Sequence, residues 1–330
     1  MRPGQPLMED LPGMRVFVTG ATGHLGRAAV RAFVEAGCTT AVLVRPDRER
    51  GASLPEWPEL TVIGGDLHDV AAFAPALHAF APDVVVHLAW FGVGNGLHDD
   101  PRQVHQNLTG SLELLEASAS AGARTFVGLG SQAEYGLPGG VLTEELLLEP
   151  ITLYGAVKAS VGLVGARLAS SLGLRFVWLR LLATYGPFDD PRHLIPFVID
   201  EYLAGRVPEL TAGEQLWDYL YVDDAARALV RVAQSQRAQG IFNLASGTSR
   251  TVASVVTAIR DLIGPELPLG LGARPYASNQ IMRLEADISR LSGATGWAPT
   301  TTLEAGLVQT LAWHRAQHSA AGQAGPHSLF

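Results

Sequence analysis

The chain is poor in cysteine and in long apolar runs, and both shortages exclude classes of protein. Cys38 is the only cysteine in 330 residues, which excludes an intrachain disulfide framework and a cysteine-rich metal cluster. No run of about 18 apolar residues occurs, as a membrane-spanning helix would need, and residues 1–12 lack the apolar core of a signal peptide. We therefore expect a soluble protein of a reducing compartment, most simply the cytoplasm, with no membrane partner.

Positive charge is scarce as well. The chain has 32 acidic and 24 basic residues, a formal net charge of −8, so it offers no diffuse positive field for nucleic acid. Its ten histidines are scattered without metal-ligand spacing, and no metal site is expected. Of the basic residues, 23 are arginine and only Lys158 is lysine. A lysine that persists in so arginine-biased a composition is a candidate for a task that arginine cannot perform, with chance retention as the alternative.

Apolar periodicity predicts an α/β fold. The chain is 47% hydrophobic and 17% charged, as expected of a folded protein with a buried core. Runs that are apolar on both faces alternate with amphipathic helical patterns. The runs lie at 14–19, 40–44, 61–66, 83–90, 124–131, 175–182 and 241–246, and the helical patterns at 25–36, 69–80, 102–121, 153–172, 222–235, 251–263 and 302–317. Right-handed crossovers between such strands give a doubly wound parallel Rossmann sheet.

The alternation breaks after 185–187, where the chain becomes richer in Pro, Asp and aromatic residues. This change predicts a second, smaller and discontinuous C-terminal domain that binds the substrate. The predicted parts are a dinucleotide-binding Rossmann domain (14–187 plus 222–246), a substrate-binding domain (188–221 plus 247–318), and disordered tails (1–13 and 319–330).

The segment TGATGHLG joins the first predicted strand to the first helix. Gly20 permits a tight turn, Gly23 lets backbone amides approach a pyrophosphate, and Gly26 lets helix and strand pack closely. The helix N-terminus adds partial positive charge. The loop therefore predicts dinucleotide binding, with a plain glycine turn as the alternative. The other loop residues assigned to the cofactor are Thr22, His24 and Leu25.

The residue after the second strand bears on the choice of cofactor. NAD-binding proteins tend to place a carboxylate there for the ribose 2′-hydroxyl, whereas arginine favours a 2′-phosphate. This chain has Arg45, with Arg48 close behind, so we predict NADP, with NAD as the alternative; the two arginines could also form a solvated turn. Asp66 and Leu67, after the third strand, are assigned to the adenine, and Ala89, after the fourth, to the cofactor ribose.

The only lysine lies four residues after a tyrosine, in Tyr154-Gly-Ala-Val-Lys158. On a helix, this spacing places both side chains on one face. A buried ammonium beside a phenol is expected to lower the pKa of the phenol, which then serves as general acid and base. Arginine is wider and more weakly hydrated, and it fits poorly beneath a nicotinamide ribose. An ordinary helix face is the alternative for this pair alone.

Together, these motifs resemble those of the extended short-chain dehydrogenases/reductases, in the NAD(P)-dependent sugar epimerase/dehydratase family, over about residues 14–318. The matching segments are TGATGHLG, GDLHD, HLAW, NLTGSLELLEA, SQAEYG, YGAVK, RLLATYGP, DYLYVDD and GWAP. The resemblance implies that Ser131 hydrogen-bonds the substrate oxygen at C4 and that Tyr154 is the acid/base. It also implies that Lys158 anchors the ribose and that Asn107 organises the substrate site from a neighbouring helix.

Departures from the family pattern narrow the predicted chemistry. In 4,6-dehydratases of this family an Asp and a Glu follow the catalytic Thr and eliminate water, whereas this chain has Gln132 and Ala133. Neither side chain exchanges protons as that reaction requires. Glu134 is next, but a shift of one residue at a strand end is expected to point it elsewhere. A dehydratase is therefore disfavoured.

The predicted substrate half departs from the pattern too. Trp217 stands where the family often has an arginine that pairs with the nucleotide diphosphate, and Ala183 replaces a frequent asparagine. Arg283 is then the better candidate for binding phosphate, unless it forms a surface ion pair with a neighbouring acid. His193 is assigned to the substrate because the family often has a ligand-contacting asparagine there; an ordinary loop histidine is the alternative.

Three hypotheses about the function follow from these residues. The first is NAD(P)H-dependent reduction of the C4 ketone of a nucleotide-activated 4-keto-6-deoxyhexose, the nucleotide being dTDP by resemblance to bacterial reductases of such sugars. The second is a 4-epimerase that retains tightly bound NAD. The third is an inactive Rossmann protein that senses the NADP redox state, which the retained Ser131, Tyr154 and Lys158 disfavour. By analogy with the family, the helices at 102–121 and 153–172 are expected to form a homodimer interface.

Overall fold

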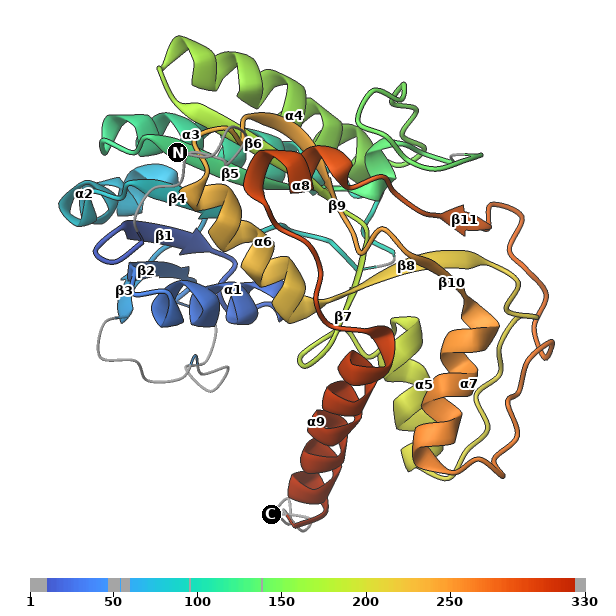
Figure 1. The fold of residues 1–330 in the computed structure, drawn as a ribbon. Coiled ribbons are helices and arrows are strands. Elements are labelled where there is room, and N and C mark those ends of the chain that lie inside the picture. The colour runs from blue at the N-terminus through green and yellow to red at the C-terminus, as the bar shows by residue number, and fades with distance from the viewer. Residues whose placement is uncertain (1–10, 47–53, 55–59, 95, 138, 324–330) are drawn as a thin grey trace.

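A parallel sheet lies at the centre of the protein (Figure 1). The computed structural model describes residues 11–46, 54, 60–94, 96–137 and 139–323. Within them, seven strands follow the order β3-β2-β1-β4-β5-β6-β9, and every neighbouring pair is parallel. These strands are β1 (Arg15–Thr19), β2 (Thr39–Val44), β3 (Leu60–Gly64), β4 (Val84–His87), β5 (Thr125–Ser131), β6 (Arg175–Leu181) and β9 (Gly240–Leu244). The order reverses at β1 and β4, as in a doubly wound Rossmann sheet, and the predicted fold class is confirmed.

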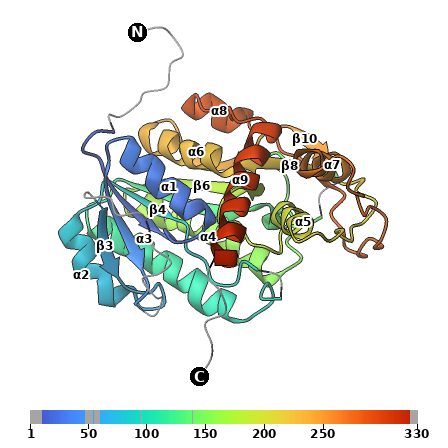
Figure 2. The ribbon, with the colours of Figure 1, turned by 90° about the horizontal axis from the view of Figure 1, so that it is seen from below.

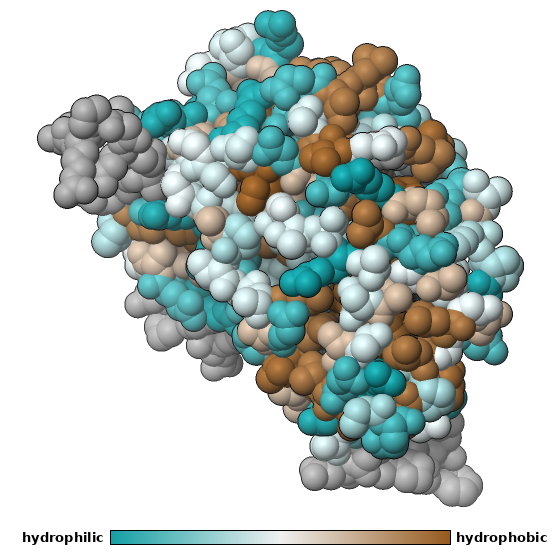
Figure 3. Space-filling model, turned by 45° about the vertical axis from the view of Figure 1, so that its right-hand side comes forward, coloured by the Kyte–Doolittle hydropathy of each residue, from teal (hydrophilic) through white to brown (hydrophobic). Residues whose placement is uncertain are grey.

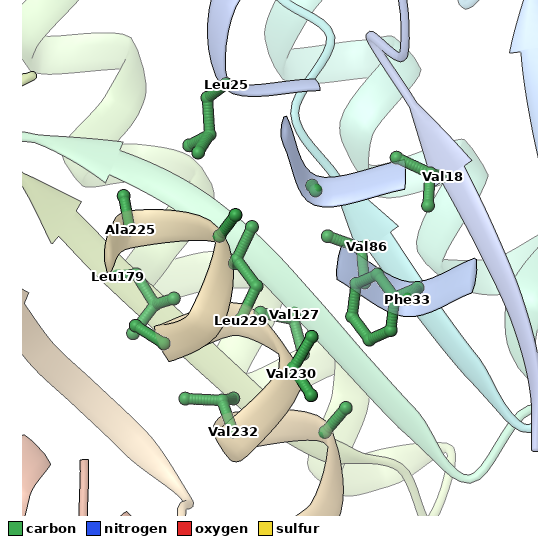
Figure 4. Packing of buried hydrophobic residues seen from close by; sticks show 14 of the residues in the cluster. Val18, Leu25, Phe33, Val86, Val127, Leu179, Ala225, Leu229, Val230 and Val232 are labelled. Carbon is green, nitrogen blue, oxygen red and sulfur yellow. The ribbon is translucent and has the colours of Figure 1, made fainter. Parts of the chain in front are cut away.

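Helices cover both faces of this sheet, as its strands, apolar on both faces, require. One apolar cluster joins the sheet to α1 (His24–Glu35), α6 (Val222–Gln234) and α8 (Ser289–Thr295), and includes Val18, Val86 and Leu229 (Figure 4). The second joins the opposite face to α2 (Val70–Phe80), α3 (Thr109–Ser120) and α4 (Leu153–Ser171). The two helical layers are visible from below in Figure 2, where α1 and α6 lie on one side of the strands and α2 and α3 on the other.

Trp178 explains why β5 contains two glycines. Its indole ring is fully buried, and at three positions beside the ring, Gly128, Gly130 and Gly162, an added Cβ atom would come too close to it. A Cβ atom added at Gly128 would lie 2.5 Å from the Trp178 ring, and one at Gly162 would lie 2.9 Å from it. Because protein interiors are close-packed, the large ring fits only where these side chains are missing. The glycines of β5 and α4 thus fix the spacing between the sheet and the helix that carries Tyr154.

A second group of elements packs beside the sheet. A small sheet joins β8 (Leu216–Tyr221) to β7 (Ala183–Tyr185), β10 (Ser249–Thr251) and β11 (Arg283–Leu284). A separate apolar cluster fills the space between α5 (Leu194–Leu203), α7 (Val252–Ile263) and α9 (Leu303–Gln323). The division into two domains stays a proposal, and α8, which lies within the predicted substrate-binding part 247–318, packs on the central sheet instead.

The structure differs from the predictions at the ends of the chain. Leu11, placed in the predicted tail, is buried against the first apolar cluster, and its carbonyl oxygen accepts a hydrogen bond from the Cys38 thiol at 3.6 Å. Helix α9 continues to Gln323, beyond its predicted end at 317, because the intervening sequence contains no proline and no glycine before Gly322. The short α8, β10 and β11 were not predicted. Residues 1–10 and 324–330 of the predicted tails lie outside the described residues.

The described helices include none that is both long and apolar enough to span a bilayer. On the face drawn in Figure 3, hydrophobic residues form separate patches among hydrophilic ones.

The packing around Trp178 predicts that Gly128→Ala destabilises the fold. The added methyl group meets the indole ring, and overpacking of this kind costs about 2 kcal/mol of unfolding free energy. Urea denaturation measures the change. The matched control is Gly293→Ala in α8, where an added Cβ has nothing within 4 Å and alanine favours the helix. Equal stabilities for the two variants would contradict this account of the core.

Candidate functional site

The candidate site lies at the carboxyl edge of the central sheet. In the strand register, Thr19 pairs with His87 and His87 with Gly128, so the segments that follow β1, β4 and β5 leave the sheet at the same edge. A Cβ atom on Gly20 would lie 2.6 Å from the backbone nitrogen of Ala89, which places the turn after β1 directly against the turn after β4. This is the edge at which open α/β sheets bind ligands.

The glycine loop has the shape that a dinucleotide requires. Gly20 has φ of +73°, which favours glycine, and a Cβ on Gly26 would overlap the carbonyl oxygen of Gly20. A Cβ on Gly23, by contrast, would meet only that oxygen, at 3.3 Å, so the outer side of the loop is open. Gly23 is the N-cap of α1, and no side chain caps the helix. The first N–H groups of α1, from His24 and Leu25 onward, are therefore available to a pyrophosphate.

The side chains of this loop hold it to the segment after β7. His24 Nδ1 donates to the carbonyl oxygen of Pro187 at 2.8 Å, and burial lowers the pKa of His24. The guanidinium of Arg27 lies 4.4 Å from the ring centroid of Phe188, a residue with φ of +64°. The His24 ring thus packs against the segment that follows β7, and its assigned contact with the cofactor stays a prediction.

Ser131 and Tyr154 come together as predicted. Ser131 ends β5 and Tyr154 lies in the first turn of α4, and the Ser131 side chain is near enough to the phenol to lower its pKa. The predicted acidification of the phenol is wrong, however. Burial raises the pKa of Tyr154 to about 12 and outweighs the hydrogen bond from Ser131, while the Glu134 carboxylate raises it further. Tyr154 is therefore a neutral phenol at physiological pH, able to donate a proton.

Lys158 is buried on the same face of α4. Its Nζ donates to the carbonyl oxygen of Leu129 at 2.6 Å and lies 3.5 Å from the ring centroid of Trp90 and 5.8 Å from that of Tyr154. Burial lowers the pKa of Lys158 to about 7, against the opposing effect of the Glu134 carboxylate. The structure thus gathers Ser131, Tyr154 and Lys158 in one buried site.

Glu134 is hydrogen-bonded to several residues around this site. Its Oε1 accepts hydrogen bonds from the backbone N–H of Ser131 and from Trp178 Nε1, both at 2.9 Å. Its Oε2 accepts from Arg180 Nε at 2.8 Å, and both side chains of this ion pair are buried. The expectation that Glu134 points away from the reacting groups therefore agrees with its contacts. The Ser-x-x-Glu pattern of a capping box, formed at η2 (Gln132–Glu134), is the signal that could have revealed this contact.

Asn107 organises the site through the backbone. It lies in the π-helical turn η1 (Gln103–Leu108), and π-helical turns are frequent at functional sites. Its Oδ1 accepts from the N–H of Phe91 at 2.8 Å, and its Nδ2 donates to the Phe91 carbonyl at 3.0 Å and to Gln103 Oε1 at 2.7 Å. Asn107 is buried, so it positions the segment after β4, and its assigned contact with the substrate stays a prediction.

His98 belongs to the site and was missed from the sequence. Its ring stacks on that of Tyr154 with centroids 4.8 Å apart and planes 19° apart, and its carbonyl oxygen accepts from the N–H of Tyr154 at 2.7 Å. No short motif contains both residues, which are far apart in sequence.

The other assigned cofactor residues border the same edge. Arg45 is exposed directly after β2; Arg48 lies outside the described residues. Asp66 pairs with His68 at 2.8 Å, and Leu67 packs against the second apolar cluster. The N–H of Ala89 donates to Thr19 Oγ1 at 3.2 Å.

The two assigned substrate residues in the smaller half both pair with acids. Arg283 forms an ion pair with Glu285 at 2.9 Å, the alternative left open by the sequence. His193, the N-cap of α5, is hydrogen-bonded to Asp189 Oδ1 at 2.8 Å, which raises the pKa of His193. Their roles toward a substrate stay predictions. Over the described residues, no group of three or more His, Cys, Asp and Glu side chains is arranged to hold a metal ion.

Comparisons with known proteins agree with this geometry. The family model "NAD dependent epimerase/dehydratase family" matches residues 16–245. The dTDP-glucose 4,6-dehydratase of Streptomyces griseus is 30% identical, over 92% of this chain and 95% of that protein.

Solved structures of similar sequence share the whole fold. The UDP-N-acetylglucosamine 4-epimerase of Methanobrevibacter ruminantium M1, in complex with UDP-N-acetylmuramic acid, is 28% identical with a TM-score of 0.84, covering 93% of this chain and 99% of that one. MoeE5, in complex with UDP-glucuronic acid and NAD, is 27% identical with a TM-score of 0.80, and the match covers 92% of this chain and 99% of the MoeE5 chain. With its glycine loop and its buried Ser131, Tyr154 and Lys158, this chain belongs to the NAD-dependent epimerase/dehydratase family.

Proposed function

We propose that the protein reduces the C4 ketone of a nucleotide-activated 4-keto-6-deoxyhexose with NAD(P)H. The observation that carries this proposal is the protonated phenol of Tyr154, buried together with Ser131 and Lys158 at one sheet edge. A protonated phenol is the state that gives a proton to a carbonyl oxygen as the ketone is reduced. The site lies at the sheet edge next to a glycine loop shaped for a dinucleotide.

The glycine loop and the first N–H groups of α1 would hold the pyrophosphate of the cofactor, and Lys158 would bind its ribose hydroxyls. When bound, the nicotinamide supplies hydride. We propose NADP as the cofactor because arginine, and not a carboxylate, follows β2 at Arg45. The related MoeE5 holds NAD, and NAD is the alternative.

Ser131 and Tyr154 would act on the substrate oxygen together. The hydroxyl of Ser131 donates a hydrogen bond to the C4 oxygen and polarises the carbonyl group, and Tyr154 transfers its proton to the same oxygen. The Ser131 side chain influences the Tyr154 phenol directly, so both donors can reach one oxygen atom. The buried positive charge of Lys158 then stabilises the phenolate that remains.

Elimination of water, the reaction of the related dehydratases, is not supported by the residues present. Gln132 and Ala133 follow Ser131, and neither exchanges a proton at neutral pH. The nearest carboxylate, Glu134, is buried and engaged by Ser131, Trp178 and Arg180. Its two oxygens hold the site together and are not free for proton exchange with a sugar.

A nucleotide-sugar 4-epimerase is the second candidate. It uses the same three residues, and the related 4-epimerase structure favours it. An epimerase first oxidises a sugar alcohol, for which Tyr154 must act as a base. We place reduction first because arginine follows β2 at Arg45, which favours a dissociable NADP over a tightly bound NAD.

For the substrate, we propose that Arg283 and His193 bind the diphosphate. On substrate binding, Arg283 would leave its ion pair with Glu285 and form two hydrogen bonds with a phosphate group. The hydrogen bond that His193 donates to the Asp189 carboxylate raises the pKa of His193 and favours its cationic form. We also propose a homodimer formed through α3 and α4, since Leu163 and Val164 on α4 are exposed.

The proposed function predicts stoichiometric cofactor consumption. Incubation with dTDP-4-keto-6-deoxyglucose and related sugars should oxidise NADPH in proportion to product, and NADPH faster than NADH, as followed by absorbance of the reduced nicotinamide. Turnover of the sugar without net loss of NADPH would instead establish the epimerase.

Tyr154→Phe should lower kcat about 100-fold or more, because the variant lacks the proton donor, while the Kd for NADPH changes little. Steady-state kinetics and fluorescence titration give the two values. Tyr202→Phe is the matched control, because the Tyr202 hydroxyl donates to the Pro268 carbonyl within the core of the smaller half. Normal turnover by Tyr154→Phe would remove this residue from the mechanism.

A further inference from the structure

Trp90 contacts both ionisable residues of the site. Its ring centroid lies 3.5 Å from Lys158 Nζ, within the range of a strong cation–π interaction. The same ring meets that of Tyr154 edge-on, with centroids 6.1 Å apart and planes 84° apart. The proposed function assigns Trp90 no role.

Hydrogen bonds fix the position of Trp90. Its Nε1 donates to Gln103 Oε1 at 2.9 Å. The amide nitrogen of Gln103 in turn donates to the carbonyl oxygens of Gly92 and Leu97, both at 3.0 Å, and Asn107 holds the next residue, Phe91, on both sides of its backbone. The indole is therefore oriented by the π-helical turn η1, and its face is presented to the ammonium.

The ammonium has few other partners. It carries three N–H donors, and among the described residues Leu129 provides its one oxygen acceptor. The nearest carboxylate, Glu134, is paired with Arg180. Trp178 is farther away, with its ring centroid 5.9 Å from Nζ. Among the aromatic rings near Lys158 in the described part of the chain, Trp90 thus lies closest to its Nζ.

We propose that Trp90 is a positioning residue that keeps the Lys158 ammonium protonated and directed toward the cofactor and Tyr154. A flat π face stabilises the cation without accepting its proton, and it leaves one N–H free for a ribose hydroxyl. The role of the charge in catalysis rests on the proposed function, whereas the contact itself does not.

The groups that face Lys158 come from several elements. Tyr154 lies on the same helix, Glu134 on η2 and His87 on β4, and Arg180, on β6, pairs with Glu134. Burial, and then the charge of Lys158, lowers the pKa of His87 to about 3, so this residue stays neutral. Because burial lowers the pKa of Lys158 to about 7, loss of one stabilising contact is enough to discharge the ammonium near neutral pH.

Lys158 is the only lysine, so the full-length protein labelled with ¹³C-lysine gives one side-chain signal without assignment. In the wild type, the Lys158 Hε protons should resonate upfield of free lysine because they lie over an indole face. Trp90→Leu should abolish that shift. It should also lower the titration midpoint of Lys158 by about one pH unit, which corresponds to the free energy of a desolvated cation–π interaction. Trp90→Phe should restore part of both effects. Trp313→Leu, which removes an indole from α9, is the control and should change neither.

An unshifted Hε signal in the wild type, or the same midpoint in Trp90→Leu as in the wild type, would overturn the proposal. A role confined to packing would lower stability without moving the midpoint.

Kinetics then separate this inference from the proposed function. With NADPH and a 4-keto sugar, Trp90→Leu should shift the alkaline fall of kcat to lower pH by the same unit. If the wild type does not turn over these substrates while the NMR results hold, the proposed function fails and the assignment of Trp90 stands. An unmoved kcat profile in an active enzyme would contradict the assignment.

Discussion

Burial of a single ammonium group at the sheet edge is the constraint on which the site depends. Taking the charge of Lys158 out of water is costly, and its surroundings offset the cost with the Leu129 carbonyl, the face of Trp90 and the nearby Glu134 carboxylate. Each partner is held by another element: the glycine-rich β5, the π-helical turn, and the ion pair with Arg180. The architecture around the site thus serves to keep one charge in place.

The same burial sets the state of Tyr154. A phenol in this environment keeps its proton, because the unfavourable burial of a phenolate outweighs the hydrogen bond from Ser131. The Tyr154 phenol is therefore protonated, which is the state that the proposed ketone reduction requires. His98 stacks on the Tyr154 ring and Trp90 meets it edge-on, so both rings restrict how Tyr154 can turn. Orientation and protonation state thus follow from one packing arrangement.

Local patterns predicted the sheet, the glycine loop and the three central residues. The apolar runs and helical periods repeat along the chain, and the Tyr154–Lys158 spacing is a property of one helix, so both are visible without tertiary contacts. The contacts of Trp90 and His98 cannot be predicted in this way, since they join segments far apart in sequence. The acidification expected for Tyr154 was wrong because the sequence shows the neighbouring lysine but not the extent of burial. Helix α9 extends beyond its predicted end because the sequence just after residue 317 contains no proline or glycine that would terminate a helix.

The most direct test of the account is the origin of the hydrogen at C4 of the product. Reduction of a dTDP-4-keto-6-deoxyhexose with NADPH fully deuterated at C4 of its nicotinamide should place one deuterium at C4 of the sugar, as read by mass spectrometry and NMR. Product without deuterium at that carbon, or with deuterium at another, would contradict a site built to deliver hydride and the proton of Tyr154 to a C4 ketone.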